Sequence, residues 1–217
     1  MTVEKIIEIL QKTDLSSDNF FSEDTFEDQV MDTLEKDPEL VFEYASGASK
    51  FVIIPEDMNE NIVIKIPFNG EVHGDEEVEF NSAACENHWD YCAVECNIYE
   101  KAYEKDLEMC FAKTEYIGNV NGHPVYKQEK AEIWDAIHTP EDYDKDKTQA
   151  VRKRTKESGH YCFNEEWLSD FLDYFGEEIF NIFLDFIEEE GVYDLHGQNL
   201  GYIGNRPVLV DYSDFCD

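Results

Sequence analysis

A long aromatic stretch, Phe163 to Glu190, limits the folds open to this chain more than any other segment. Its large apolar residues recur at helical spacing, which predicts one long helix with an apolar face to bury. These residues are Trp167, Leu168, Phe171, Leu172, Phe175, Ile179, Phe180, Phe183, Phe186 and Ile187. Asn164 suits the start of the helix, Gly191 suits its end, and Gly176 is expected to bend it. The stretch therefore predicts the core helix of the C-terminal half.

Three pairs of short apolar runs, each pair separated by turn residues, predict β-hairpins. They are residues 46–55 with 62–67, 114–120 with 123–131, and 200–203 with 207–210. Asn121-Gly122 divides the second pair, and this dipeptide is the strongest short hairpin signal. A helix over Ser82 to Lys105 is expected between the first two hairpins, because its apolar side chains recur on one face. Hairpins and helices together indicate an α+β fold.

The first 45 residues predict a helical segment ahead of these elements. Residues 2–12 have apolar side chains on one helical face, and a second helix is expected from about Thr25 to Phe42, with an interruption at Pro38.

Residues 138–160 are polar and rich in basic side chains. We expect this segment to be an exposed linker or insertion; a docking arm for an acidic partner or for phosphates is the less favoured alternative.

The charge of the chain restricts its partners. There are 17 Lys and Arg against 51 Asp and Glu, a formal net charge of −34. Such a field disfavours direct binding to nucleic acids or anionic membranes, because both polyanions need basic contacts. It favours cationic partners, such as a small molecule or a basic protein, or metal ions. The alternative is that the acidic balance serves only solubility, which is the more common case. Apolar content of 42%, with 14% aromatic residues, nevertheless indicates a folded globule.

The N-terminal sequence and the cysteines together indicate a reducing cellular compartment. The opening MTVEKIIEIL is charged and amphipathic, unlike a signal peptide, and no apolar run approaches the length of a membrane span. The six cysteines are therefore expected to be reduced, in a cytoplasm.

The C-terminal tail contains a constellation suited to phosphoryl transfer. Asp194 is followed five residues later by Asn199, and Asp211 ends the apolar run Val208 to Val210. Magnesium prefers hard oxygen ligands, one or two of them carboxylates, with phosphate and water supplying the rest. Asn199 and Asp211 are thus candidate metal ligands, and Asp194 is a candidate base for an attacking hydroxyl.

Upstream, Lys65 lies in the strand-like run VIKIP, and Glu95 borders the apolar face of the predicted helix. A lone ammonium on a rigid strand can reach nucleotide phosphates as a point charge. An equally favoured interpretation is that Lys65 is an ordinary strand lysine that faces the solvent. For Glu95, the competing interpretation is a solvated carboxylate on the surface of the helix.

These motifs, in this order, resemble the protein-kinase-like superfamily, and DLHGQN is closest to aminoglycoside phosphotransferase-like small-molecule kinases. The resemblance implies a bilobal fold: a small antiparallel-sheet N-lobe at 46–131 and a helical C-lobe at 132–217, with 1–45 as an N-terminal helical extension. The chain given ends six residues after Asp211, so the C-lobe is expected to be reduced.

The resemblance also implies a function and site residues. The expected function is ATP- and Mg²⁺-dependent phosphotransfer to a small or cationic acceptor. The catalytic residues would be Asp194, Lys65 and Glu95, where Glu95 pairs with Lys65 and fixes its position, with Glu100 as the reserve candidate for this pairing. The metal ligands would be Asn199 and Asp211. Nucleotide would be bound by Gly47, Ser49 and Lys65, and by main-chain contacts to adenine at Gln128, Glu129 and Lys130.

Three departures from the family pattern keep other functions open. Val192 stands where the family has a histidine, the segment Ser46 to Lys50 has one glycine where the family's loop has three, and the second lobe is expected to be reduced. These favour a catalytically inactive pseudokinase as the alternative. An acidic inhibitor that mimics nucleic acid toward a basic protein belongs to the same class of non-catalytic functions.

Overall fold

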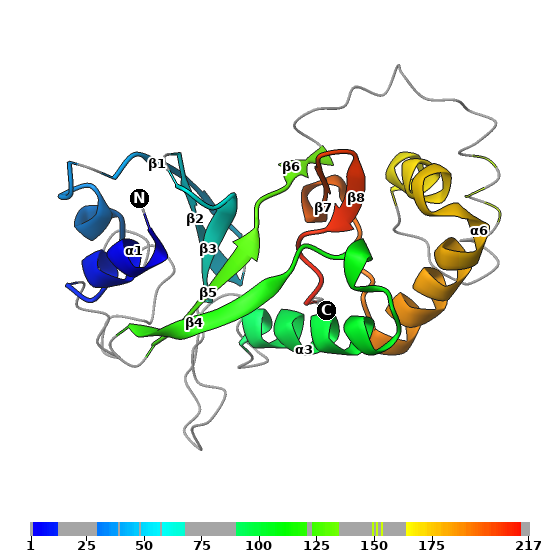
Figure 1. The fold of residues 1–217 in the computed structure, drawn as a ribbon, viewed down its shortest axis with the longest axis horizontal. Coiled ribbons are helices and arrows are strands. Elements are labelled where there is room, and N and C mark those ends of the chain that lie inside the picture. Colours follow the sequence, from blue (N-terminus) through cyan, green and yellow to red (C-terminus); the bar gives the residue numbers. More distant parts are fainter. Residues whose placement is uncertain are drawn as a thin grey trace. The chain divides into compact units, whose positions relative to one another are not determined.

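The structure, a computed structural model, describes residues 2–12, 30–38, 40–47, 49–56, 58–67, 90–120, 123–134, 149, 151, 153 and 164–213. The chain is α+β and divides into two compact units, each with an antiparallel sheet (Figure 1). Unit 1 comprises Met1–Cys96 and Thr114–Glu129, and unit 2 comprises Asn97–Lys113 and Lys130–Asp217.

Unit 1 is built on a five-stranded antiparallel sheet with the order β1-β2-β3-β5-β4. The strands are β1 (Phe42–Ser46), β2 (Lys50–Pro55), β3 (Ile62–Pro67), β4 (Thr114–Val120) and β5 (His123–Glu129). The hairpins expected at β2–β3 and β4–β5 are confirmed; the Asn-Gly turn itself lies outside the described residues. The predicted end of the second helix, at Phe42, is wrong. Residues 30–34 are helical, but Phe42 opens β1 and pairs with Pro55.

One face of this sheet is apolar and packs against the N-terminal helices. Side chains alternate between the two faces of a strand, so Phe51 and Ile53 of β2 share a face with Ile64 and Ile66 of β3. They form one buried cluster with α1 (Val3–Leu10) and with residues from the 30–34 helix. The described helices of the predicted N-terminal helical extension, residues 1–45, therefore contribute to the core of unit 1.

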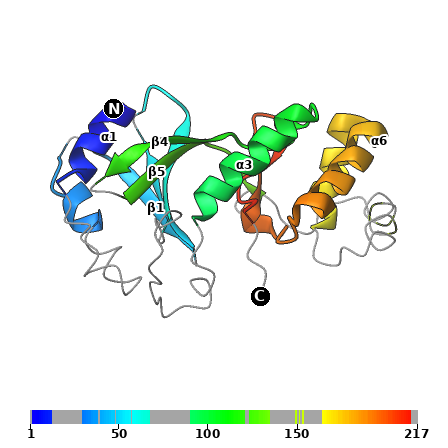
Figure 2. The same cartoon turned by 90° about the horizontal axis from the view of Figure 1, so that it is seen from below.

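The other face, here called the polar face, carries Lys50, Lys65 and Gln128 as well as Val52 and Val63, and it faces α3 (Tyr91–Glu104). Figure 2 shows α1 and α3 on opposite sides of β4 and β5. A helix was expected from Ser82 to Lys105, and its first part lies outside the described residues. The start of α3 is held to β5, because the Tyr126 hydroxyl donates to Asp90 Oδ2 at 2.5 Å. Burial raises the pKa of this Asp90 carboxyl, while the hydrogen bond from Tyr126 acts in the opposite direction.

Unit 2 contains the predicted long helix as α6 (Glu165–Glu190). The Asn164 side chain caps its start by accepting from the Trp167 N–H at 3.0 Å, and Gly191 ends it at φ 75°. Gly176 interrupts the helix at φ 82°, as predicted from the sequence. Both glycines adopt left-handed backbone angles that a side chain would strain. The helix buries its aromatic face, where Phe171 and Phe183 stack with ring centroids 4.4 Å apart.

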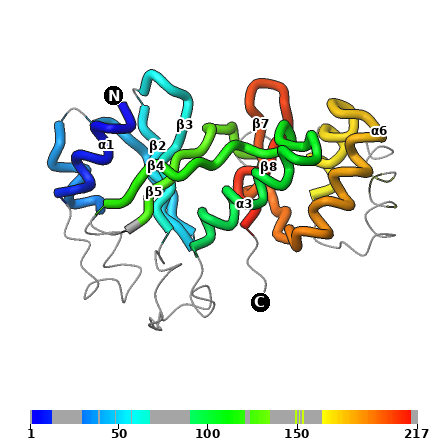
Figure 3. The backbone as a smooth tube through the Cα atoms, turned by 60° about the horizontal axis from the view of Figure 1, so that its bottom comes forward, coloured from blue at the N-terminus to red at the C-terminus, as the bar shows by residue number. Residues whose placement is uncertain are grey.

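The sheet of unit 2 has three short antiparallel strands in the order β6-β7-β8. They are β6 (Glu132–Ile133), β7 (Leu200–Ile203) and β8 (Arg206–Leu209), with the 3₁₀ turns η3 (Glu108–Cys110) and η4 (Gly197–Asn199) beside them. The third predicted hairpin, β7–β8, is confirmed and appears in red in Figure 3. Most of segment 138–160 lies outside the described residues. No helix in the described ranges is long and apolar enough to cross a membrane.

Cys110 gives unit 2 a predictable pH dependence. Its thiol is fully buried in η3, and burial raises its pKa from 9.0 to about 12. Because the folded-state pKa lies above the unfolded one, the stabilisation is complete below pH 9 and falls as the pH rises toward 12. Between about pH 8 and 10.5, the wild type should therefore lose about 2 kcal/mol more free energy of unfolding than Cys110→Ala. Urea denaturation at the two pH values measures this. Equal losses in the two proteins would contradict it.

Candidate functional site

The centre of the polar face in unit 1 is a buried ion pair between Lys65 of β3 and Glu95 of α3. Lys65 Nζ lies 2.8 Å from Glu95 Oε1 and 2.9 Å from Oε2. Lys65 is 4% exposed and Glu95 is fully buried. Neither side chain is therefore solvent-exposed, which was the alternative interpretation of each residue. The partner expected for Lys65 from the sequence is thus the one that the structure brings to it.

A second lysine joins this pair. Lys50 begins β2, and its Nζ lies 2.8 Å from the same Glu95 oxygen, Oε1. Lys50 is 3% exposed. Lys50 was not predicted as a site residue from the sequence, although the pairing of the β2–β3 hairpin places it on the same face as Lys65. Val52 pairs with Lys65, so Lys50, two residues before Val52, lies on the same face of the sheet.

Two neutral side chains complete the surroundings of Glu95. The Thr114 hydroxyl donates to Oε2 at 2.7 Å, and Gln128 Nε2 donates to Oε2 at 3.2 Å. Gln128 Nε2 also donates to the Thr114 hydroxyl at 2.8 Å. Together with Lys50 and Lys65, four side chains donate to this one carboxylate, which fixes its position.

The position of Gln128 corrects its predicted role. It lies within β5, paired with Val63 on one side and Thr114 on the other, so its main chain belongs to the sheet ladder. A main-chain contact with adenine is therefore not available at Gln128, whose side chain instead serves Glu95. Glu129 is the last residue of β5, and Lys130 follows the strand.

The candidate phosphate-covering turn joins β1 to β2. The Gly47 N–H donates to the Lys50 carbonyl at 3.1 Å, so the hydrogen bond that closes the turn ends at Lys50. Gly47 is exposed and Ser49 is half-buried. A Cβ at Gly47 would meet no atom within 4 Å, so packing does not require glycine there.

In unit 2, the loop after α6 brings the predicted base and a predicted metal ligand together. Asn199 Nδ2 donates to the Asp194 carbonyl at 2.8 Å and to Asp194 Oδ2 at 3.1 Å. Asn199 is buried, whereas the Asp194 side chain is 45% exposed. His196 Nε2 lies 3.5 Å from Asp194 Oδ2, and its Nδ1 accepts from the Gln198 N–H. His196 was not among the predicted site residues.

Asp211 lies next to this loop. The Asn199 carbonyl accepts from the N–H groups of Val210, at 2.9 Å, and of Asp211, at 3.4 Å. The Ser213 hydroxyl donates to Asp211 Oδ1 at 3.2 Å. Tyr212 between them is buried, and its hydroxyl donates to the Ala112 carbonyl at 2.8 Å. The backbone therefore holds Asp211 beside Asn199.

The donor set of unit 2 fits a divalent ion only in part. Asn199 and Asp211 carry the hard oxygen atoms that Mg²⁺ prefers. Within the described residues, however, no group of three His, Cys, Asp or Glu side chains is arranged to hold a metal ion. A magnesium ion here would need further oxygen ligands from a phosphate-bearing ligand or from water, which is the usual arrangement for Mg²⁺ with nucleotides.

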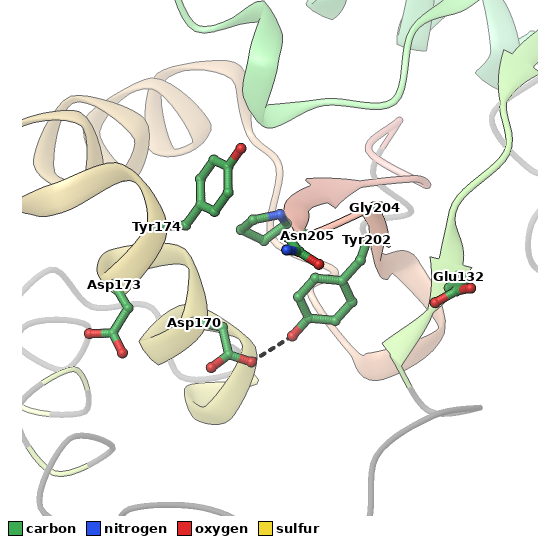
Figure 4. Close-up of a pocket in the computed structure, with 8 residues that line it drawn as sticks. Glu132, Asp170, Asp173, Tyr174, Tyr202, Gly204 and Asn205 are labelled. Carbon is green, nitrogen blue, oxygen red and sulfur yellow. Dashed lines mark hydrogen bonds between the residues drawn. The ribbon is translucent and has the colours of Figure 1, made fainter.

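A separate pocket in unit 2 has acidic and aromatic walls (Figure 4). Its volume is about 480 Å³, and its lining includes Glu132, Asp170, Asp173, Tyr174 and Tyr202. The Tyr202 hydroxyl donates to Asp170 Oδ2 at 2.7 Å, the contact drawn as a dashed line. Carboxylates and tyrosine rings are the groups that recognise organic cations.

Comparison with known proteins adds no function. No family model matches this chain, and neither a curated protein nor a solved structure matches it. A functional assignment therefore rests on the chemistry of the lysine–glutamate cluster in unit 1 and of the Asp194, Asn199 and Asp211 group in unit 2.

Proposed function

We propose that the protein is an ATP- and magnesium-dependent phosphotransferase with a bilobal protein-kinase-like fold, acting on a small or cationic acceptor. The observation that carries this proposal is the buried contact of 2.8 Å between Lys65 and Glu95. In the kinase template, a strand lysine binds phosphates and a helix glutamate positions the lysine. The helix that carries Glu95 also lies between β3 and β4 along the chain, in a sheet ordered β1-β2-β3-β5-β4.

In this proposal, unit 1 provides the phosphate-binding charge. The Lys65 ammonium, fixed by Glu95, binds nucleotide phosphates as a point charge. Gly47 and Ser49, in the adjoining turn, lie over the phosphates, to which Ser49 offers its hydroxyl; the Gly47 N–H donates to the Lys50 carbonyl and fixes the turn. The cluster acts by position and charge, which are the main contributions to phosphoryl-transfer catalysis.

Unit 2 provides the proton acceptor and the metal ligands. The acceptor's hydroxyl oxygen forms a bond to the γ-phosphorus of ATP, the bond from that phosphorus to the bridging oxygen breaks, and ADP leaves. The hydroxyl proton passes to Asp194, which Asn199 orients through its amide nitrogen at 3.1 Å. Asn199 and Asp211 would hold Mg²⁺, which, when bound, neutralises charge on the phosphates.

The acidic pocket supports a cationic acceptor or partner. Glu132, Asp170 and Asp173 place carboxylates from β6 and α6 around it, and Tyr174 and Tyr202 add aromatic surface. The net charge of −34 attracts the same class of molecule over a longer range. An amine-bearing small molecule or a basic protein segment therefore fits this proposal better than an acidic acceptor.

A second candidate is a catalytically inactive kinase-like protein that binds nucleotide or a basic partner without phosphate transfer. The observation that favours it is Val192, which is buried two residues before Asp194, where the kinase pattern has a histidine. The acidic inhibitor and nucleic-acid mimic belong to this candidate and are favoured by the net charge of −34.

Thermal unfolding with and without Mg-ATP tests nucleotide binding. A ligand at 100 times its Kd stabilises the native protein by about 2.7 kcal/mol, so millimolar Mg-ATP should raise the Tm of the wild type. Asp211→Asn removes a metal-binding carboxylate while preserving size, and it should lose the magnesium-dependent part of the shift. Asp185→Asn, at an exposed position of α6, is the matched control and should keep the full shift. No shift of the wild type at millimolar Mg-ATP would overturn the proposed function.

A further inference from the structure

The first turn of α3 is tied to the sheet of unit 1 through Tyr126 of β5. The Tyr126 hydroxyl donates to Asp90 Oδ2 at 2.5 Å, and Asp90 is 1% exposed. The other carboxylate oxygen, Oδ1, accepts from the Ala93 N–H at 3.0 Å and so caps the start of the helix. One side chain therefore both caps α3 and fixes it to the polar face.

Tyr126 lies directly beside the lysine that Glu95 contacts. The register of β3 and β5 pairs Lys65 with Tyr126, so the two side chains leave the sheet on the same face from paired positions. Glu95 follows Asp90 by five residues, which is about 7.5 Å along the helix axis. The helix thus meets the polar face at two neighbouring points, the Tyr126 hydroxyl and the Lys65 ammonium.

The helical backbone joins these two points rigidly. The Val94 N–H donates to the Asp90 carbonyl at 3.1 Å, which begins the hydrogen-bond ladder of the helix between Asp90 and Glu95. The position of Asp90 therefore determines the position of Glu95. A shift of the first turn would move the Glu95 carboxylate away from its contact of 2.8 Å with Lys65.

We infer that Tyr126 and Asp90 are positioning residues, which hold α3 where Glu95 fixes the Lys65 ammonium. Neither is a catalytic residue, because each acts through Glu95. The consequence for phosphate transfer rests on the proposed function, whereas the consequence for the Lys65–Glu95 contact does not. In a merely structural role, loss of the Tyr126 hydroxyl would loosen unit 1 as a whole, without a particular effect on Lys65.

Tyr126→Phe, which removes only the hydroxyl, tests this inference on the full chain. The exchange of the Lys65 ammonium hydrogens with solvent, measured by NMR of nitrogen-labelled lysine side chains, reports how firmly Glu95 holds Lys65. We expect Tyr126→Phe to speed up this exchange about 10-fold. Exchange of the amide hydrogens of α1, on the other face of the sheet, should stay as in the wild type. Lys65→Arg assigns the signal, because it removes the Lys65 resonance.

The rate of phosphate transfer is the second measurement. Misplacement of a reacting group by about 1 Å can cost about 10²-fold in rate, so Tyr126→Phe should lower kcat about 10- to 100-fold. The KM for Mg-ATP should stay within about 3-fold, because the Lys65 charge is kept and only its exact placement in the transition state is lost.

Tyr116→Phe is the matched control. Tyr116 pairs with Tyr126 from β4, and the two rings lie 5.6 Å apart between centroids, but Tyr116 is 54% exposed. This variant should behave as the wild type in both measurements.

Asp90→Ser tests the same contact from the helix side. Serine keeps an oxygen that caps the helix but lacks the second oxygen that accepts from Tyr126. Asp90→Ser should therefore match Tyr126→Phe, and the combined variant should have no larger effect than either change alone. If Tyr126→Phe does not fold, Asp90→Ser is measured in its place.

The outcomes separate this inference from the proposed function. Faster Lys65 exchange in a protein that does not bind Mg-ATP would support the positioning role and overturn the nucleotide function. Unchanged Lys65 exchange in Tyr126→Phe, with normal phosphate transfer, would overturn the positioning role alone. Equal acceleration of exchange at Lys65 and in α1, or an unchanged kcat despite faster Lys65 exchange, would overturn it as well.

Discussion

Replacing Glu95 by alanine is expected to lower the free energy of unfolding by about 3–5 kcal/mol, because it leaves buried ammonium groups without their carboxylate. Lys50 and Lys65 each lie 2.8 Å from this carboxylate, and Thr114 and Gln128 also donate to it. The change thus removes the acceptor of four side chains at once. Urea denaturation monitored by circular dichroism measures the loss.

Two further variants show whether the buried charges cause this loss. Glu100→Ala changes an exposed carboxylate of the same helix and should cost no more than about 0.5 kcal/mol. Combining Glu95→Leu with Lys50→Met and Lys65→Met removes all three charges and should recover most of the lost stability. The buried-charge explanation fails if Glu95→Ala and Glu100→Ala are equally stable, or if the triple variant is less stable than Glu95→Ala alone.

Asp194→Asn is expected to reduce phosphate transfer by a factor of about 10² to 10⁴, the range attributed to a general base. Asparagine keeps the size of the side chain and an oxygen acceptor, so Mg-ATP binding should change little. The measurement is ADP release and acceptor phosphorylation, with amine-bearing sugars and a basic peptide compared with a neutral sugar. The acidic pocket and the net charge of −34 predict that the cationic acceptors react faster.

Asp185→Asn serves again as the control for the loss of one carboxylate from unit 2, and it should transfer phosphate at the wild-type rate. An Asp194→Asn protein with undiminished transfer would exclude Asp194 as the base. A wild type that binds Mg-ATP but phosphorylates none of the acceptors would instead support the inactive kinase-like candidate, for which the buried Val192 already argues.

The elements that were predictable from the sequence are those fixed by nearby residues. The limits of α6 follow from Asn164 and Gly191, whose side chain and backbone angle act within one turn of the helix. The hairpins follow from turn residues and alternating strands in the same way. The strand β1 was missed because nothing local distinguishes Phe42 from a helix end; its conformation is fixed by pairing with Pro55.

The candidate site shows the same limit. Lys65 and Glu95 could be proposed as partners because the resemblance supplied a template for them. Lys50 had no such template, and its contact with Glu95 joins residues 45 positions apart. Only the β2–β3 register places Lys50 on the correct face, and the position of α3 then determines what it meets. The adenine contact expected at Gln128 failed for a related reason, since strand pairing takes up its main chain.

The two units differ in how early during translation all of their segments are available for folding. Every segment assigned to unit 1 has been translated once Glu129 is made. Unit 2 instead joins Phe111 to Leu209 through an isolated β-bridge, and Ala112 to Tyr212 through a hydrogen bond that spans 100 residues. Such contacts cannot form while the later partner is still in the ribosomal tunnel. During translation, Phe111 and Ala112 therefore emerge about 100 residues before Leu209 and Tyr212, and a nascent chain cannot bury them against these partners until the later residues follow.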